Sequence, residues 1–113
     1  MAKVELQFGE LGGGINPIID SISVTAGSSS YAYVNVPKKP KYISAIWYVN
    51  STTPLYVMEY DGVNDTYMGS YTSVRGAVTP SSALAWMEVN DDKIGFKTPS
   101  GWQGTSVAYT FCF

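Results

Sequence analysis

Carboxylates are the only side chains in this sequence that are suited to acid–base chemistry. The chain of 113 residues contains no histidine and a single cysteine, Cys112. Histidine-based triads, histidine general bases and imidazole zinc sites therefore cannot be built from it. Cys112 has no histidine to activate it and no second cysteine to form a disulfide. We therefore interpret Cys112 as a small apolar residue of the last strand.

The acidic residues gather around two expected hairpins. They are Glu59, Asp61 and Asp65 at the first hairpin, and Glu88, Asp91 and Asp92 at the second. Glycosidases need two carboxylates about 5–10 Å apart across a cleft, and nothing in the sequence indicates that Glu59 and Glu88 face each other. Carboxylates in turns ordinarily accept hydrogen bonds from backbone N–H groups. We therefore predict that the protein is not an enzyme.

Two loops contain residues that could bind an ion or a phosphate group. Asp61, Asn64 and Asp65 offer oxygen ligands, but their spacing does not match an EF-hand loop. Turn formation is the favoured interpretation, and we predict neither a metal nor another cofactor. Gly12, Gly13 and Gly14 are not followed by the Lys and Ser/Thr of a phosphate-binding loop, so we interpret them as a hinge.

Aromatic residues are the most informative group, with nine tyrosines and three tryptophans. In a strand of period two, Tyr42 and Tyr48 lie opposite Trp47, and they point outward if Trp47 is buried. Trp86 has the parity of outward polar residues, and Trp102 lies in a loop between glycines. Exposed rings bury a large area at low entropic cost, and flat rings stack on sugars. We therefore predict that Tyr42, Tyr48, Trp86 and Trp102 belong to a contact surface for another protein chain or for a glycan.

The elements that position these side chains are expected to be strands. Period-two alternation, frequent turn residues and the lack of helical apolar spacing predict an all-β fold, a single antiparallel β-sandwich of jelly-roll type, with a small barrel as the alternative. Residues 73–82 are expected to form a loop. The eight expected strands are residues 20–26, 31–36, 42–50, 55–60, 66–72, 83–89, 93–98 and 105–113. The expected core contains the Trp47 side of the strand over residues 42–50, together with residues of the strands over 93–98 and 105–113. Its members are Ile43, Ala45, Trp47, Val49, Ile94, Phe96, Val107, Tyr109 and Phe111.

The first residues form a separate segment. Residues 3–8 alternate polar and apolar side chains, which places Val4, Leu6 and Phe8 on one face. We divide the chain into an arm with its glycine hinge, residues 1–19, and a β-sandwich domain, residues 20–113. An isolated strand leaves its backbone unpaired, so we predict that the arm pairs with the sheet edge of a neighbouring subunit. An arm that folds back onto its own sandwich is the alternative.

The charge and hydropathy of the chain argue against nucleic acids and membranes as partners. The net charge is −2, and without a basic excess nucleic-acid binding is disfavoured. No apolar run approaches the ~20 residues of a membrane span, and the first residues lack the apolar core of a signal peptide. We therefore expect synthesis in a cytoplasm without membrane insertion.

Three segments resemble small structural proteins encoded among the tail and appendage genes of bacteriophages and prophages of Gram-positive and gut bacteria. They are residues 8–14 (FGELGGG), 22–27 (ISVTAG) and 34–43 (VNVPKKPKYI). The resemblance implies a virion component, such as a fibre, baseplate or capsid-decorating subunit, that is made in the host cytoplasm. It also implies other virion proteins and copies of the chain as partners, with a trimer favoured, and a host-surface glycan for those members that serve adhesion. A stand-alone carbohydrate-binding module is the alternative.

Overall fold

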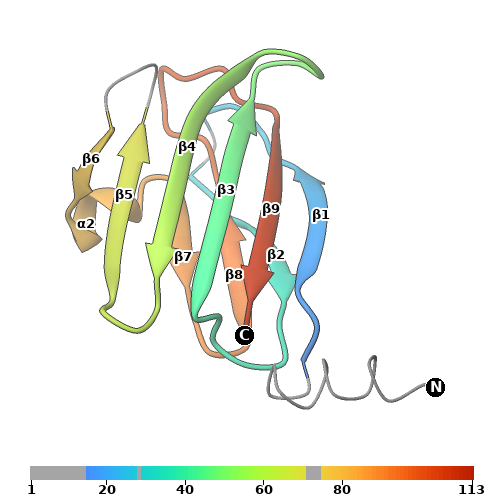
Figure 1. Ribbon diagram of the computed structural model, residues 1–113. Coiled ribbons are helices and arrows are strands. Elements are labelled where there is room, and N and C mark those ends of the chain that lie inside the picture. Colours follow the sequence, from blue (N-terminus) through green and yellow to red (C-terminus); the bar gives the residue numbers. More distant parts are fainter. Residues whose placement is uncertain (1–14, 28, 71–74) are drawn as a thin grey trace.

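Two antiparallel β-sheets packed face to face make up the body of the protein (Figure 1). The structure is a computed structural model, and it describes residues 15–27, 29–70 and 75–113. The prediction of an all-β antiparallel sandwich is confirmed. The predicted arm residues Val4, Leu6 and Phe8 and the hinge Gly12–Gly14 lie outside the described residues.

The larger sheet contains six strands in the order β1, β9, β3, β4, β5, β6. All of its neighbouring strands pair antiparallel, and β1 and β6 form its two edges. The strands are β1 Ile18–Ser23, β3 Tyr42–Tyr48, β4 Pro54–Asp61, β5 Thr66–Ser70, β6 Arg75–Val78 and β9 Ser106–Cys112.

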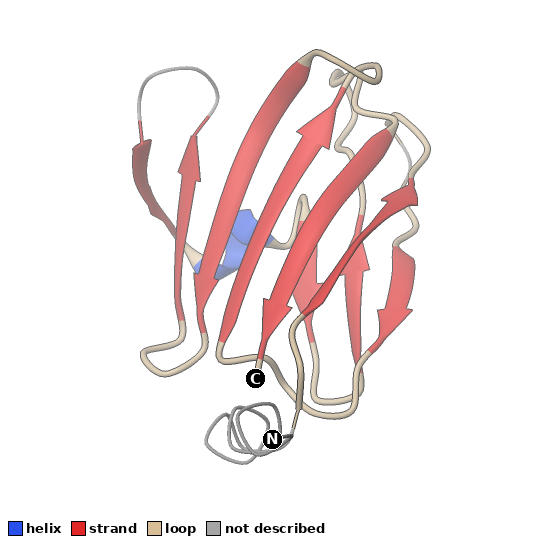
Figure 2. Cartoon of the chain, turned by 45° about the vertical axis from the view of Figure 1, so that its right-hand side comes forward, coloured by secondary structure: helices blue, strands red, loops and turns tan. Residues whose placement is uncertain are grey.

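The smaller sheet contains three antiparallel strands in the order β2, β8, β7. They are β2 Ala32–Asn35, β7 Met87–Val89 and β8 Lys93–Phe96. Figure 2 shows this sheet behind the larger one, with the short helix α2 (Pro80–Ala83) on the same side. The six-stranded sheet thus has one face turned toward the core and one outer face.

The core lies between the two sheets, and it contains every residue predicted for it except Val49, which is half-buried beyond the end of β3. Strands β3 and β9 alternate buried and half-buried residues, as expected when one face of a strand packs on a core. Trp47 crosses from β3 to the smaller sheet, where its Nε1 donates to the carbonyl oxygen of Lys97 at 3.0 Å. The fully buried predicted residues are Ile43, Ala45, Trp47, Ile94, Phe96, Val107 and Phe111, and Tyr109 is nearly buried.

The expectation of a loop over residues 73–82 is wrong for its described part. Residues 75–78 form the edge strand β6, which pairs with β5 from Tyr67↔Val78 to Ser70↔Arg75. A segment of four residues that contains glycine has a low strand propensity of its own. Residues 75–78 form a strand because their backbone pairs with β5. Thr79 then caps α2, with its Oγ1 accepting from Ser82 N at 3.2 Å and with proline in the first turn, as helix starts favour.

Both predicted hairpins are confirmed. β4 and β5 pair across residues 61–65, and β7 and β8 pair across residues 90–92. Within the first turn, Asp65 adopts a φ of 56°, a conformation that Asp and Asn tolerate better than most residues. The two hairpins place Glu59 and Glu88 in different sheets.

Candidate functional site

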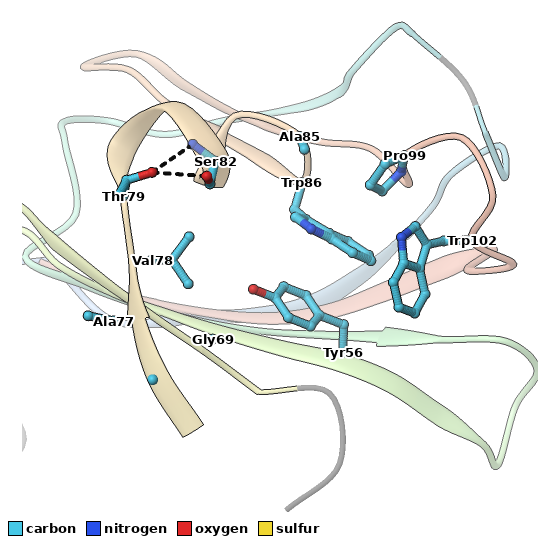
Figure 3. Close-up of a pocket in the computed structure, with 11 residues that line it drawn as sticks. Tyr56, Gly69, Ala77, Val78, Thr79, Ser82, Ala85, Trp86, Pro99 and Trp102 are labelled. Carbon is cyan, nitrogen blue, oxygen red and sulfur yellow. Dashed lines mark hydrogen bonds between the residues drawn. The ribbon is translucent and has the colours of Figure 1, made fainter. Parts of the chain in front are cut away.

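A pocket of about 640 Å³ opens between β5, β6, α2 and the loop that follows β8. Its volume falls within the ~300–1,000 Å³ typical of ligand sites. Figure 3 shows that aromatic rings form one side of the space, while Val78 and α2 form the other. The lining residues are Tyr56, Gly69, Gly76, Ala77, Val78, Thr79, Ser82, Ala85, Trp86, Pro99 and Trp102. We call this site the aromatic pocket.

Three aromatic rings in contact form the aromatic wall. The rings of Tyr56 and Trp86 are stacked with centroids 4.2 Å apart and an interplanar angle of 26°. Trp102 is tilted against Trp86 at 5.5 Å. Trp86 also makes an edge contact at 5.4 Å with Trp47 in the core. The wall is therefore anchored in the core, which fixes its rings in place before any ligand arrives.

The predicted outward position of Trp86 is wrong, because only 5% of its surface is exposed. The prediction extended the alternation of a strand back to residue 83, whereas β7 begins at Met87. Trp86 instead belongs to the turn after α2, where its backbone N–H donates to the carbonyl of Ala83 at 2.9 Å. Turn geometry, not strand parity, thus directs the indole inward.

Trp102 lies in a loop, as the sequence indicated, and a tight turn presents it. The backbone N–H of Trp102 donates to the carbonyl of Pro99 at 3.1 Å. Gly101 has a φ of 90°, the left-handed conformation that the third residue of a type II turn requires. The indole is half-buried against the core cluster. It therefore forms the outer end of the aromatic wall.

Two glycines form part of the opposite wall. Gly69 and Gly76 are register partners on β5 and β6, and they lie on the inner face, two residues from the inward pair Tyr67 and Val78. A Cβ placed on Gly69 would collide with the hydroxyl of Tyr56, whereas a Cβ on Gly76 would meet nothing within 4 Å. Gly69 thus admits the Tyr56 side chain, and Gly76 borders open space.

Hydroxyl groups supply the polar side of the pocket. Thr79 Oγ1 donates to Ser82 Oγ at 2.9 Å while it caps α2, and Figure 3 shows these two residues side by side above Val78. A serine hydroxyl that accepts one hydrogen bond can also donate one. Rings and hydroxyls in one cavity are the combination that a sugar requires, because its ring has an apolar face and a polar rim.

The four predicted contact residues do not form one surface. Trp86 and Trp102 line the aromatic pocket. Tyr42 and Tyr48 lie on the outer face of the six-stranded sheet, which confirms that they lie opposite the buried Trp47. Tyr42 donates to Glu59 Oε2 at 2.7 Å there, and this hydrogen bond raises the pKa of Tyr42.

Tyr56, the third ring of the wall, was not among the predicted contact residues. Tyr56 alternates with Met58 and Tyr60 along β4, and all three are buried. The same period-two argument that placed Trp47 inward would have placed Tyr56 inward too. The glycine pair carries no local signal, since only the pairing of β5 with β6 brings Gly69 and Gly76 together.

The carboxylates considered for catalysis lie on opposite sides of the sandwich. Glu59 forms an ion pair with Arg75 on the outer face of the six-stranded sheet. Glu88 faces outward from the smaller sheet, where it accepts from Tyr33 at 2.8 Å and from Asn90 at 3.0 Å. Both hydrogen bonds lower the pKa of Glu88, and the one from Asn90 has the larger effect. The two carboxylates therefore do not share a cleft.

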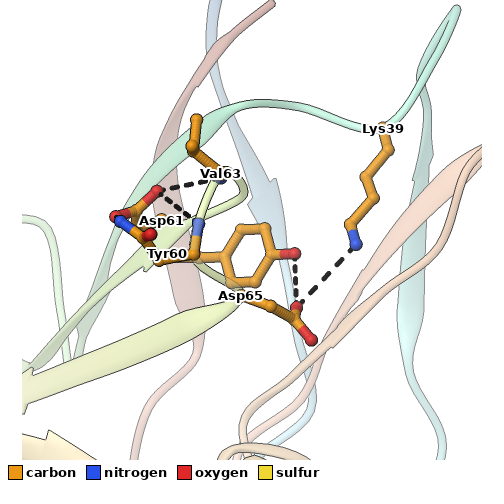
Figure 4. A network of polar contacts seen from close by, with 6 residues as sticks. Lys39, Tyr60, Asp61, Val63 and Asp65 are labelled. Atoms are coloured by element: carbon orange, nitrogen blue, oxygen red, sulfur yellow. Dashed lines mark hydrogen bonds and ion pairs between the residues drawn. The ribbon is translucent and has the colours of Figure 1, made fainter.

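The polar side chains of Asp61 and Asn64 stabilise the hairpin turn. Asp61 Oδ1 accepts from the backbone N–H groups of Val63 at 2.9 Å and Asn64 at 3.2 Å. The Asn64 side chain and these N–H groups lower the pKa of Asp61. Asp65 accepts from Tyr60 Oη at 2.7 Å and lies 3.8 Å from the Lys39 ammonium (Figure 4). In the described parts of the chain, no group of three or more His, Cys, Asp or Glu residues could hold a metal ion.

Comparisons of the chain with protein-family models, with curated proteins and with solved structures found no match. No helix within the described ranges is long and apolar enough to span a bilayer.

Proposed function

We propose that this chain is a non-enzymatic structural subunit of a bacteriophage or prophage virion, and that its body binds a host-surface saccharide in the aromatic pocket. The observation that carries the binding role is the wall of Tyr56, Trp86 and Trp102 facing the hydroxyls of Thr79 and Ser82 across one cavity. The placement of Glu59 and Glu88 on opposite outer faces supports binding over hydrolysis. The virion setting is supported by the resemblance in the sequence.

Core anchoring favours tight recognition. Trp86 contacts both Tyr56 and Trp47, so ring positions are set by the fold and little ordering cost falls on binding. Trp102 is the most accessible ring of the wall, which makes it the ring expected to stack on the ligand. Its contribution should be about 1–2 kcal/mol, or roughly tenfold in affinity.

A glycan array followed by isothermal titration calorimetry tests the binding role. Trp102→Ala should weaken binding about tenfold or more, with circular dichroism confirming that the sandwich persists. Tyr48→Ala removes an aromatic side chain from the outer face of the six-stranded sheet and serves as the matched control. Binding that depends on Tyr48 and not on Trp102 would move the site to the outer face. A protein that binds no glycan would refute the saccharide role.

A stand-alone carbohydrate-binding module is the second candidate, because the aromatic pocket by itself would serve such a module equally well. Mass spectrometry of purified phage particles from a host that carries the gene separates the two settings. A virion subunit is present in a defined copy number, and a free module is absent. Light scattering after size-exclusion chromatography adds a second measurement, because a virion subunit is expected as a discrete oligomer and a module as a monomer.

A further inference from the structure

We infer that the aromatic pocket selects a neutral saccharide unit and rejects an anionic one such as a sialic or uronic acid. This inference rests on the proposed saccharide-binding function and specifies its ligand class. The positions of the charged side chains around the pocket support this selectivity.

Among the residues that the structure describes, the pocket wall carries no charged side chain. Its eleven lining residues are glycine, alanine, valine, proline, serine, threonine, tyrosine and tryptophan. The hydroxyls of Thr79 and Ser82 can bond a sugar hydroxyl, but they provide no positive charge to a carboxylate. A carboxylate that packs against this wall gives up part of its hydration without gaining a counter-ion, which is unfavourable.

The charged residues nearest in sequence to the pocket are directed away from it. Arg75, which precedes Gly76, forms an ion pair with Glu59 on the outer face of the six-stranded sheet. Lys97 lies over the ring of Tyr31, with Nζ 4.7 Å from the ring centroid.

Glu88, two residues after Trp86, is also held outside. Its carboxylate accepts hydrogen bonds from Tyr33 and Asn90 on the outer face of the smaller sheet. Arg75, Lys97 and Glu88 therefore each have a partner on an outer face. Neither of the two cations is available to neutralise an anionic ligand inside the pocket.

Paired glycans that differ by one charge test the selectivity. N-acetyllactosamine and its 3′-sialyl form are one pair, and a glucose oligosaccharide and its counterpart ending in glucuronic acid are another. Both pairs are titrated at about 0.15 M salt, where the long-range repulsion between an anionic glycan and a protein of net charge −2 is screened. We expect the neutral member of the binding pair to bind at least tenfold more tightly, and Trp102→Ala to weaken that binding about tenfold. An anionic member that binds as tightly as its neutral partner in a Trp102-dependent manner would overturn the inference and leave the proposed function standing. Absence of binding by every glycan would overturn both.

A positive charge added to the pocket should shift its preference from neutral toward anionic glycans, which gives a second test. Gly76 borders open space, so Gly76→Lys places an ammonium in the pocket, and Gly76→Met adds a side chain of similar length without charge. Gly76→Lys should raise the affinity for the anionic glycan relative to the neutral one by at least tenfold, whereas Gly76→Met should weaken both to a similar degree. Equal preferences in the two variants would contradict the inference.

Discussion

Two glycines that face each other across one pair of strands should respond oppositely to the same substitution. Gly69 and Gly76 are register partners on β5 and β6 and border the same cavity. Alanine in place of glycine reduces the entropy of the unfolded chain and stabilises a compatible strand by about 0.5–1 kcal/mol. The outcome therefore depends on the space that each Cβ finds.

At Gly76 that space is empty. A Cβ there meets no atom within 4 Å, and the residue's φ is not in the left-handed region. Gly76→Ala should therefore raise the free energy of unfolding by about 0.5–1 kcal/mol.

At Gly69 the space is occupied. A Cβ would collide with the Tyr56 hydroxyl and would lie 2.8 Å from Val78 Cγ2. Tyr56 cannot withdraw easily, because its ring is stacked on Trp86. Gly69→Ala should cost about 1–3 kcal/mol, as overpacking usually does.

Urea unfolding monitored by tryptophan fluorescence measures both variants. The expected difference between them is about 1.5–4 kcal/mol, well above the error of the method. Gly69→Ala should also displace the Tyr56 ring and change the emission of Trp86, which the native-state spectrum before unfolding would record. Equal effects of the two substitutions would refute the placement of the glycines, and with it the geometry of the aromatic pocket.

Three further perturbations address the arm, the core and the surface charges. Deletion of residues 1–9 should leave a soluble folded body and abolish self-assembly, as judged by light scattering; a truncated chain that cannot fold would show that the arm completes its own sandwich. Thr98→Val should raise the free energy of unfolding by about 1–3 kcal/mol, because Thr98 Oγ1 is buried without a hydrogen-bond partner among the described residues; a lower stability in urea would contradict this. Hydrogen bonds lower the pKa of Glu88, so its stabilising effect is complete above the ordinary carboxyl pKa of about 4.3 and is lost as the pH falls through the lowered folded-state value. Wild type should therefore lose more stability than Glu88→Gln over this acidic range, and parallel pH profiles would contradict the assignment.

The features that sequence predicted well are those set by local alternation. Val107 and Phe111 alternate with polar or small residues, and burying one face of their strand is enough to place them in the core. The hairpin at residues 61–65 was also predictable, because its turn residues carry their own hydrogen bonds.

Features that depend on long-range pairing were not predictable. β6 is a strand because β5 pairs with it, and Trp86 turns inward because α2 ends just before it. The aromatic pocket needs both, together with the loop that carries Trp102. These three segments are far apart in the sequence, so no local pattern contains the whole pocket. The sequence indicated two of the rings, Trp86 and Trp102, and the wrong orientation for Trp86.

Sheet order separates the two roles that we propose for the chain. β1, which begins at Ile18 near the end of the predicted arm and hinge, lies at one edge of the six-stranded sheet, and β6 lies at the other with the aromatic pocket beside it. The described part of the chain therefore begins beside the edge opposite to the pocket. Assembly and saccharide binding can then vary independently, and deletion of residues 1–9 should leave the affinity of each pocket unchanged while it removes avidity. A truncated chain with weaker binding at a single pocket would instead place the arm, or a neighbour's arm, in contact with the pocket itself.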